Sequence, residues 1–227
     1  MFSPVLLIAF VGGLLPSLLW LAFWLLEDRC EPEPKRYIFW SFIAGMLAVL
    51  VVLPLERAFI GQLTGLSLLF TWAIIEEVCK LGAAALALRS RALDEPIDAV
   101  IYMVTAALGF AAAENALFLL GPLQGGDPIQ TIITGDLRFV GATLLHTLAS
   151  ATIGLSVALS FYRSREVRRW YVAGGVILAI ALHTIFNFFI LERGGGVTFT
   201  VFVSIWVGII AALLLIERVK RPSRDYC

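Results

Sequence analysis

The sequence contains few charged residues, and this scarcity excludes the largest class of proteins. Only 15% of the 227 residues are Asp, Glu, Lys or Arg, whereas 60% are hydrophobic, and the mean hydropathy is +0.92. Soluble domains usually carry about 25% charged residues, so a soluble fold is excluded. The composition instead predicts an all-α membrane protein whose helices cross the bilayer several times.

The basic residues do not outnumber the acidic ones, which excludes a protein that binds nucleic acid. The chain has 17 Lys and Arg residues against 17 Asp and Glu residues, and the basic ones are scattered among short loops. A basic segment is also missing before the first hydrophobic stretch, Phe2 to Leu26, which is too long for the apolar core of a signal peptide. We therefore expect this stretch to be an uncleaved first transmembrane helix.

Seven hydrophobic segments are long enough to cross a bilayer. About 20 residues in a helix are needed to span ~30 Å of hydrocarbon. The segments that meet this length lie at approximately residues 3–26, 37–55, 63–88, 97–120, 138–162, 170–191 and 197–216. We expect residues 1–227 to form a single integral membrane domain with about seven transmembrane helices and an internal polar site.

The Lys and Arg residues between these segments predict the orientation. Loops rich and poor in basic residues alternate along the chain, with 13 basic residues in the rich set, 3 in the poor set, and Lys80 inside a segment. Because cytoplasmic loops carry the excess of Lys and Arg, the N-terminus is predicted to be outside and the C-terminus in the cytoplasm. Cys30 and Cys227 then face a reducing compartment, where no disulfide is expected. Cys79 is interpreted as a packing residue, since the neighbouring glutamates disfavour its thiolate.

Polar side chains interrupt four of the hydrophobic segments. They are Glu76, Glu77, Lys80, Glu114, His146, His183 and Asn187. Each charge at mid-membrane depth costs about 2.5–3.5 kcal/mol, so residues of this kind are usually functional. Counting from the segment ends at ~1.5 Å per residue places all of them between the middle of the membrane and its outer leaflet. The sequence thus predicts one polar chamber that opens outward.

This set of side chains favours hydrolysis. A carboxylate can take a proton from water, and imidazoles can bind a metal or polarise a carbonyl group. A catalytic zinc ion has three protein ligands and one open position. Glu114, His146 and His183 could supply the three ligands, which leaves Glu76 or Glu77 as the base.

A site without metal is equally consistent with these residues. A glutamate would then activate the water, while His183 and Asn187 would polarise the scissile carbonyl group. Lys80 lies three residues after Glu77 and four after Glu76, so it can pair with one of the two carboxylates and tune the pair.

Two other classes of function would use the same residues differently. An ion- or proton-coupled transporter could relay ions along the buried carboxylates and histidines, but the internal repeats and broken helices typical of such proteins are not seen. A purely structural site would need complete charge pairing, yet Lys80 is the only basic residue deep inside a segment, against the three carboxylates of Glu76, Glu77 and Glu114. Arg138 and Asp136 are expected only to mark the outer end of the fifth segment.

The longest predicted connection runs from Gly121 to Leu137. It begins with several Gly and Pro residues and continues with Ile129, Ile132 and Ile133 at near-helical spacing. We expect a short segment at the membrane surface that covers or gates the chamber, with an ordinary connecting loop as the alternative.

The ordered motifs resemble those of the PrsW family of intramembrane proteases. They are Glu76-Glu77-x-x-Lys80, Phe110-x-x-x-Glu114-Asn115, His146 and His183-x-x-x-Asn187. With an acidic, proline-bearing loop at residues 28–34, the resemblance spans roughly residues 1–190. This family is related more distantly to the CAAX prenyl endopeptidases and bacteriocin-processing proteins.

The resemblance implies a peptidase of the bacterial plasma membrane. Its substrate would be a single-pass membrane protein cut near the outer face, as in the founding case of an anti-sigma factor. The family's essential glutamates fall on Glu76 and Glu77, and its other motif positions fall on Glu114, His146 and His183. The resemblance leaves open whether the enzyme depends on a metal such as Zn²⁺ or on a glutamate alone.

Overall fold

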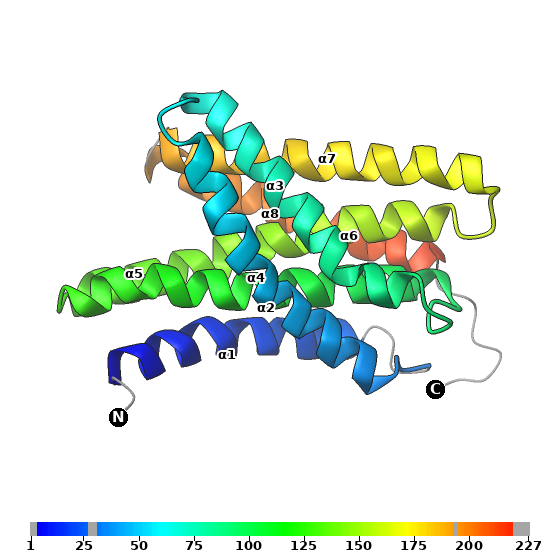
Figure 1. The fold of residues 1–227 in the computed structure, drawn as a ribbon, viewed down its shortest axis with the longest axis horizontal. Coiled ribbons are helices and arrows are strands. Elements are labelled where there is room, and N and C mark those ends of the chain that lie inside the picture. Colours follow the sequence, from blue (N-terminus) through cyan, green and yellow to red (C-terminus); the bar gives the residue numbers. More distant parts are fainter. Residues whose placement is uncertain (1–3, 27–30, 193–194, 220–227) are drawn as a thin grey trace.

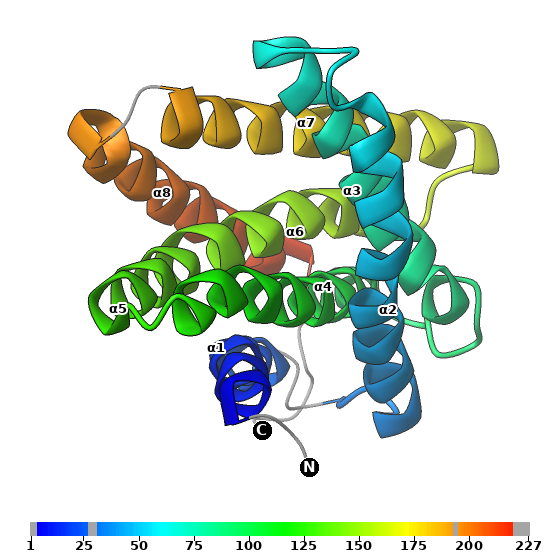
Figure 2. The same ribbon diagram turned by 60° about the vertical axis from the view of Figure 1, so that its left-hand side comes forward.

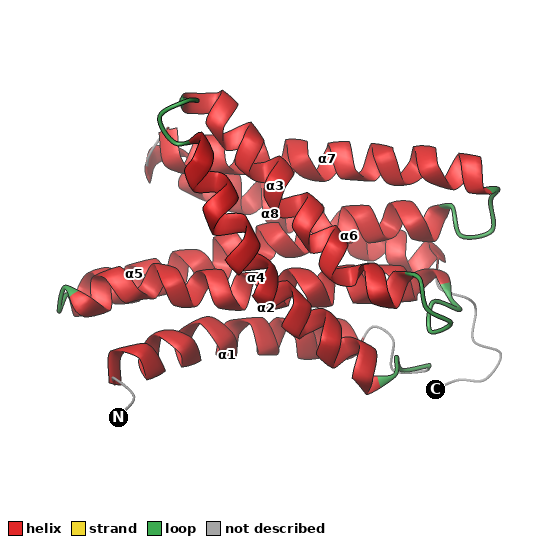
Figure 3. Ribbon diagram, in the orientation of Figure 1, coloured by secondary structure: helices red, strands yellow, loops and turns green. Residues whose placement is uncertain are grey.

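The computed structural model describes residues 4–26, 31–192 and 195–219, and within these ranges the chain consists of helices joined by short loops and contains no strand (Figure 3). The helices are α1 (Pro4–Leu26), α2 (Lys35–Phe59), α3 (Gly65–Leu88), α4 (Pro96–Gln124), α5 (Pro128–Leu137), the π-helix η1 (Arg138–Ala142), α6 (Thr143–Leu159), α7 (Arg165–Glu192) and α8 (Gly195–Val219). Cys30 and Cys227 lie outside the described residues, so the expectation of no disulfide there stays a prediction.

Five of these helices are long and apolar enough to cross a membrane: α1, α2, α4, α7 and α8. This confirms the prediction of an all-α protein that crosses the membrane several times. Two further helices coincide with predicted segments but differ from a simple apolar span. Helix α3 carries the charged residues of the first motif, and α6 has only 17 residues.

Helix α4 forms the centre of the bundle. It packs against α1, α2 and α6, which surround it in both views (Figures 1 and 2). Almost every side chain from Pro96 to Ala112 is buried. A helix that is apolar on all sides belongs in the core of a bundle, because no face of it gains from exposure. The central position of α4 presents its next turns, with Glu114 and Asn115, to the neighbouring helices.

Helices α2 and α4 cross at a contact that only glycine allows. A Cβ atom added at Gly109 would lie 2.0 Å from the carbonyl oxygen of Phe42, and one added at Gly45 would lie 2.0 Å from that of Ala106. Small residues at such crossings let two membrane helices approach closely. The crossing holds Phe110, the residue after Gly109, next to the polar site.

We expect Gly109→Ala to lower the stability of the folded protein by about 1–3 kcal/mol, because the backbone of α2 must move to accommodate the added methyl group. Gly174→Ala in α7 is the matched control, since no atom lies within 4 Å of the Cβ that it adds. Alanine favours a helix over glycine by up to about 1 kcal/mol, so the control should be neutral or stabilising. Thermal unfolding in detergent measures both variants, and equal melting temperatures would refute the close crossing.

The connection predicted from Gly121 to Leu137 is much shorter than expected. Helix α4 continues to Gln124, and α5 begins at Pro128 after Asp127, whose side chain accepts a hydrogen bond of 2.9 Å from the backbone N–H of Gln130. The expected loop was wrong because Gly121 and Pro122 lie in the last turn of α4, and membrane helices tolerate glycine and proline where the freed backbone groups find other partners. The predicted helical segment with three exposed isoleucines is confirmed as α5. Its covering role stays a prediction.

The fifth predicted segment, residues 138–162, also differs from the structure at both ends. Helix α5 leads directly into η1 and then α6, so the chain is helical from Pro128 and the regular helix ends at Leu159. The π-helix is a local register change in this long helical stretch. Such changes are frequent at functional sites and cannot be recognised from hydrophobicity alone.

Candidate active site

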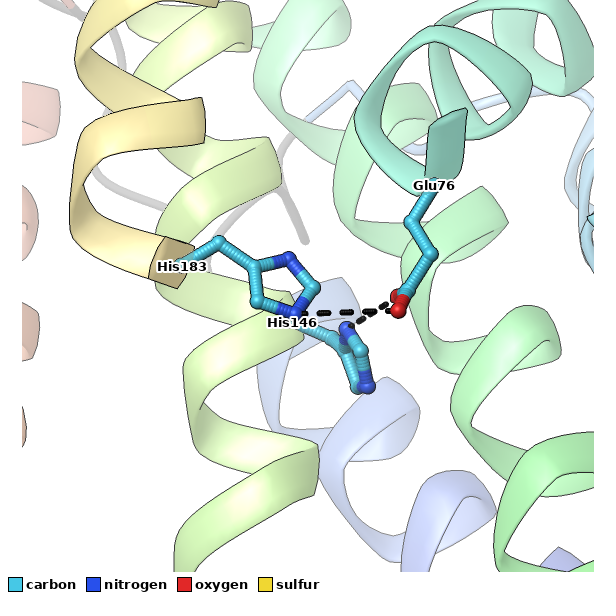
Figure 4. Close-up of side chains that lie close together, drawn as sticks. All are labelled: Glu76, His146 and His183. Carbon is cyan, nitrogen blue, oxygen red and sulfur yellow. Dashed lines mark ion pairs between the residues drawn. The ribbon is translucent and has the colours of Figure 1, made fainter. Parts of the chain in front are cut away.

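Three helices bring the side chains of Glu76, His146 and His183 together in the interior of the bundle. One ligand atom from each side chain lies within 4.8 Å of the others. His146 Nδ1 is 3.8 Å from Glu76 Oε2, and His183 Nε2 is 3.8 Å from Glu76 Oε1 (Figure 4). All three residues are at most 5% exposed. The polar chamber predicted from the sequence therefore corresponds to a compact group on α3, α6 and α7.

Small residues on the same helix faces permit this approach. Ala84 lies one turn after Lys80 on α3, Ala149 lies one turn after His146 on α6, and Ala179 lies one turn before His183 on α7. All three alanines are fully buried in one apolar cluster. Because their side chains are short, the three helices can pack closely enough for the longer polar side chains to meet.

Each histidine also contacts a second carboxylate, through the ring nitrogen that points away from Glu76. His183 Nδ1 lies 2.8 Å from Glu77 Oε1, and His146 Nε2 lies 2.9 Å from Glu114 Oε2. An ionised carboxylate only accepts hydrogen bonds, so the imidazole nitrogen that faces it carries the proton. The other nitrogen of each ring, which faces Glu76, then carries the lone pair and can accept.

Lys80 contacts both glutamates of α3 and His146 of α6. Its ammonium group is 2.6 Å from Glu77 Oε1, 3.5 Å from Glu76 Oε2 and 2.9 Å from His146 Nδ1. A lysine ammonium can only donate, which independently requires Nδ1 of His146 to be the acceptor. The ammonium group also lies 4.9 Å from the centre of the Phe110 ring, which supplies a cation–π contact.

Both residues of the Phe-x-x-x-Glu motif on α4 contact His146. The ring of Phe110 packs edge-on against His146, with 5.4 Å between ring centres, while Glu114 one turn later bonds the same imidazole. Residues four apart lie on one face of a helix. The two motif residues therefore hold His146 by its ring edge and by its Nε2 atom.

Arg138 was expected only to mark a helix end, and this expectation is wrong. Its Nη2 atom is 2.5 Å from Glu114 Oε2, and its Nε atom donates a hydrogen bond of 2.6 Å to Asn115 Oδ1. The site thus has a second cation, so Lys80 is not the only basic group opposite its carboxylates. The π-helix carries Arg138 into contact with α4, which the sequence did not reveal.

A fourth carboxylate was also missed. Glu56, near the end of α2, is half-buried, and its carboxyl group interacts with that of Glu76. Glu56 lies next to Arg57 and a predicted loop, so in the sequence it resembles the charged residues that are common at the ends of membrane helices. The segment boundary at residue 55 excluded it from the predicted chamber by one residue.

The two asparagines of the motifs differ in their surroundings. Asn115 is buried and bonds both Arg138 and Thr143, so it joins α4 to the start of α6. Asn187 is half-buried and forms no side-chain hydrogen bond with any residue that the structure describes. Its predicted contact with an oxyanion stays a prediction.

The group of three differs in one member from the ligand set expected from the sequence. Glu76, rather than Glu114, faces the unprotonated nitrogens of both histidines, whereas Glu114 contacts His146 from the opposite side. Two histidines and one glutamate form a donor set known for catalytic zinc. Glu76 Oε2 is buried and accepts no hydrogen bond from the described residues. The residues present therefore fit a metal ion.

Exposure of the side chains indicates the accessible side of the site. The side chains of Glu114 and Arg138 are 18% and 15% exposed, whereas those of Glu77 and Lys80 are fully buried. The group is thus least buried on the side of η1. An apolar cavity of about 190 Å³ lies between α6, α7 and α8, and its lining includes Leu145 and Leu182, each of which directly precedes a histidine of the site.

Comparison with known proteins decides the class to which this site belongs. The model of the PrsW family of intramembrane metalloproteases matches residues 33–214. This chain belongs to the PrsW family. The predicted resemblance is confirmed, and the protein is a peptidase of an intramembrane metalloprotease family.

Several relatives of the chain are named Protease PrsW. The protein from Geobacillus kaustophilus is 25% identical over 220 residues, covering 94% of this chain and 92% of its own. Those from Clostridioides difficile and Bacillus subtilis are 25% and 21% identical, covering 80% and 78% of this chain and 79% and 80% of their own. No solved structure matches the chain. The transporter alternative is not favoured by these relationships.

Proposed function

We propose that this PrsW-family protease cuts a single-pass protein anchored in the bacterial plasma membrane, close to the outer face. An anti-sigma-factor-like regulator is the kind of substrate that fits. The proposal includes a single integral domain of seven transmembrane helices with the N-terminus outside and the C-terminus in the cytoplasm, as the alternation of basic loops predicts. The observation that carries it is the convergence of Glu76 with the lone-pair nitrogens of His146 and His183.

The proposed metal ligands are Glu76, His146 and His183, and zinc is the proposed ion. When bound, zinc polarises a carbonyl group and makes a bound water acidic enough to ionise near neutral pH. Glu77 and Glu114 hold the two imidazoles with their lone pairs directed toward Glu76. Carboxylates in this role typically raise metal affinity by about 10- to 100-fold.

Glu77 is the proposed general base. Its Oε1 atom is occupied by Lys80 and His183, whereas its buried Oε2 atom has no hydrogen-bond partner among the described residues. This oxygen would accept the proton of the attacking water and then return it to the leaving amine. Asn187 would donate to the oxyanion, and Lys80 would keep Glu77 ionised.

A specific contact favours a second candidate mechanism for the same peptidase. The ammonium group of Lys80 lies 2.9 Å from His146 Nδ1, which is the nitrogen that a metal would need. In this glutamate-only mechanism, Lys80 keeps that position, Glu76 is the base, and His183 with Asn187 polarises the carbonyl group.

Metal analysis combined with cleavage assays tests the proposal. The protein would be purified in lipid nanodiscs, its zinc content measured by mass spectrometry, and cleavage followed on a panel of single-pass reporter proteins. We expect one zinc ion per chain, and loss of cleavage on chelation that added zinc restores. Full activity of protein without metal would select the glutamate-only mechanism. Failure to cut any anchored reporter, while soluble versions of the same sequences are cut, would overturn the proposed substrate class.

A further inference from the structure

Arg138 contacts three residues on one face of α4. Its Nη2 atom pairs with Glu114, its Nε atom bonds Asn115, and its guanidinium carbon lies 3.9 Å from the centre of the Phe118 ring. These positions follow one another within about one helical turn, so the planar guanidinium group spans them with hydrogen bonds in its plane and ring stacking on its face. Lysine has neither feature.

The backbone of Arg138 is fixed by the same network. Thr143 Oγ1 donates a hydrogen bond of 3.0 Å to the carbonyl oxygen of Arg138 and accepts one of 2.9 Å from Asn115 Nδ2. Both Asn115 and Thr143 are buried. The π-helix η1 is thus attached to α4 both through the backbone carbonyl of Arg138 and through the side chain of Arg138.

The ion pair with Arg138 has a direct consequence for His146. Glu114 Oε2 accepts from Arg138 Nη2 and lies 2.9 Å from His146 Nε2, so one oxygen atom is shared by the two groups. The guanidinium group fixes the position of this oxygen. The oxygen in turn holds His146 at Nε2 and, together with Lys80 at Nδ1, fixes where the ring points.

We propose that Arg138 is a positioning residue that, through Glu114, keeps the Nδ1 lone pair of His146 directed at Glu76. It does not touch the reacting atoms, and it rests on the proposed function only in that Glu76, His146 and His183 are taken as the zinc ligands. The π-helix η1 places Arg138 next to Glu114. An α-helical continuation from α5 into α6 would rotate residue 138 relative to His146.

The two histidines of the chain make a sharp test possible. The sequence contains no other histidine, so ¹⁵N NMR of protein labelled at histidine reports both rings without overlap. The hydrogen bonds place the proton on Nε2 of His146 and on Nδ1 of His183, which gives opposite tautomers in metal-free protein. Arg138→Gln should weaken the hydrogen bond between His146 Nε2 and Glu114 and so shift the ¹⁵N resonance of that nitrogen, while Lys80 still keeps Nδ1 as the acceptor. His183, which is held by Glu77, should be unchanged and acts as the internal control.

Zinc affinity is the second readout. We expect Arg138→Gln to weaken zinc binding by about 10- to 100-fold, as removal of support from a ligating histidine does. Arg138→Lys retains the charge but not the planar group, so its effect should be intermediate, and it also serves if the Gln variant folds poorly. Arg57→Gln removes an exposed arginine at the end of α2 and should leave both readouts unchanged.

The outcomes separate this inference from the proposed function. If both variants keep the wild-type ¹⁵N resonances of His146 and the wild-type zinc affinity but melt at lower temperature, Arg138 only stabilises the fold and the inference is overturned. If the wild-type protein binds no zinc, the proposed metal site fails. The ¹⁵N resonance of His146 Nε2 in Arg138→Gln still decides the positioning role in that case, because it is read without metal.

Discussion

Replacing Glu76 by Gln is expected to abolish zinc binding and peptide hydrolysis together. The substitution removes one of the three proposed ligands and the negative charge that both histidine lone pairs face. Its effect on zinc affinity should therefore exceed the roughly 10- to 100-fold loss that follows removal of a residue supporting a ligand. Calorimetric zinc titration and cleavage of an anchored reporter measure the two effects on the same preparation.

Glu77→Gln is the informative partner of this variant, because the two adjacent glutamates face opposite nitrogens of His183 and only Glu76 also faces His146. As the proposed base, Glu77 contributes about 10²- to 10⁴-fold to the rate. Its loss should reduce cleavage by that factor while one zinc ion per chain still binds, more weakly, since His183 loses its carboxylate partner. Glu166→Gln, at the exposed start of α7, controls for the change of charge. Zinc lost in Glu77→Gln but retained in Glu76→Gln would reverse the two assignments.

The members of the site were predictable because the bilayer makes each of them conspicuous. A glutamate or histidine in a segment that must cross hydrocarbon is costly, so Glu77, Glu114 and His183 could be recognised one at a time. Helix boundaries set their approximate depth. The structure adds which atoms meet, and this depends on the rotation of each helix about its axis.

Rotation is also why the group of three side chains that meet differs in one member from the ligand set expected from the sequence. Glu76 and Glu114 occur at compatible depths, and no spacing within the sequence indicates that Glu76 faces both histidines while Glu114 lies behind His146. The close packing of α3, α6 and α7 through their alanines decides this. Such packing is a property of the assembled bundle.

Arg138 and Glu56 were overlooked for a different reason. Charged residues near the ends of membrane helices are ordinary, because they can reach the polar interface. Only the π-helix at η1 and the approach of α2 to α3 make these two residues part of the site. Neither residue belongs to a sequence motif comparable to those that contain Glu76, Glu114, His146 and His183.

Lys80→Met is expected to cost the folded protein about 3–5 kcal/mol, the range found when one partner of a buried ion pair is removed. The side chains of Lys80 and Glu77 are fully buried and their charged atoms are 2.6 Å apart. Methionine fills a similar volume, so the lost charge rather than a cavity would cause the effect. Leu81→Met, at the next position of α3, controls for methionine itself. Unfolding in detergent titrated with denaturing surfactant measures the difference.

The double variant Lys80→Met/Glu77→Gln distinguishes an unpaired charge from lost packing. If the penalty arises from a carboxylate left without its counter-ion, neutralising Glu77 should restore most of the stability, and the two substitutions will be strongly non-additive. Additive losses would show that the ion pair contributes little.

The zinc affinity of Lys80→Met should rise although its stability falls, because removal of the ammonium group frees His146 Nδ1 and eliminates a positive charge beside the proposed ligands. A variant that is less stable without metal but binds zinc more tightly would show that Lys80 and the metal compete for the same lone pair.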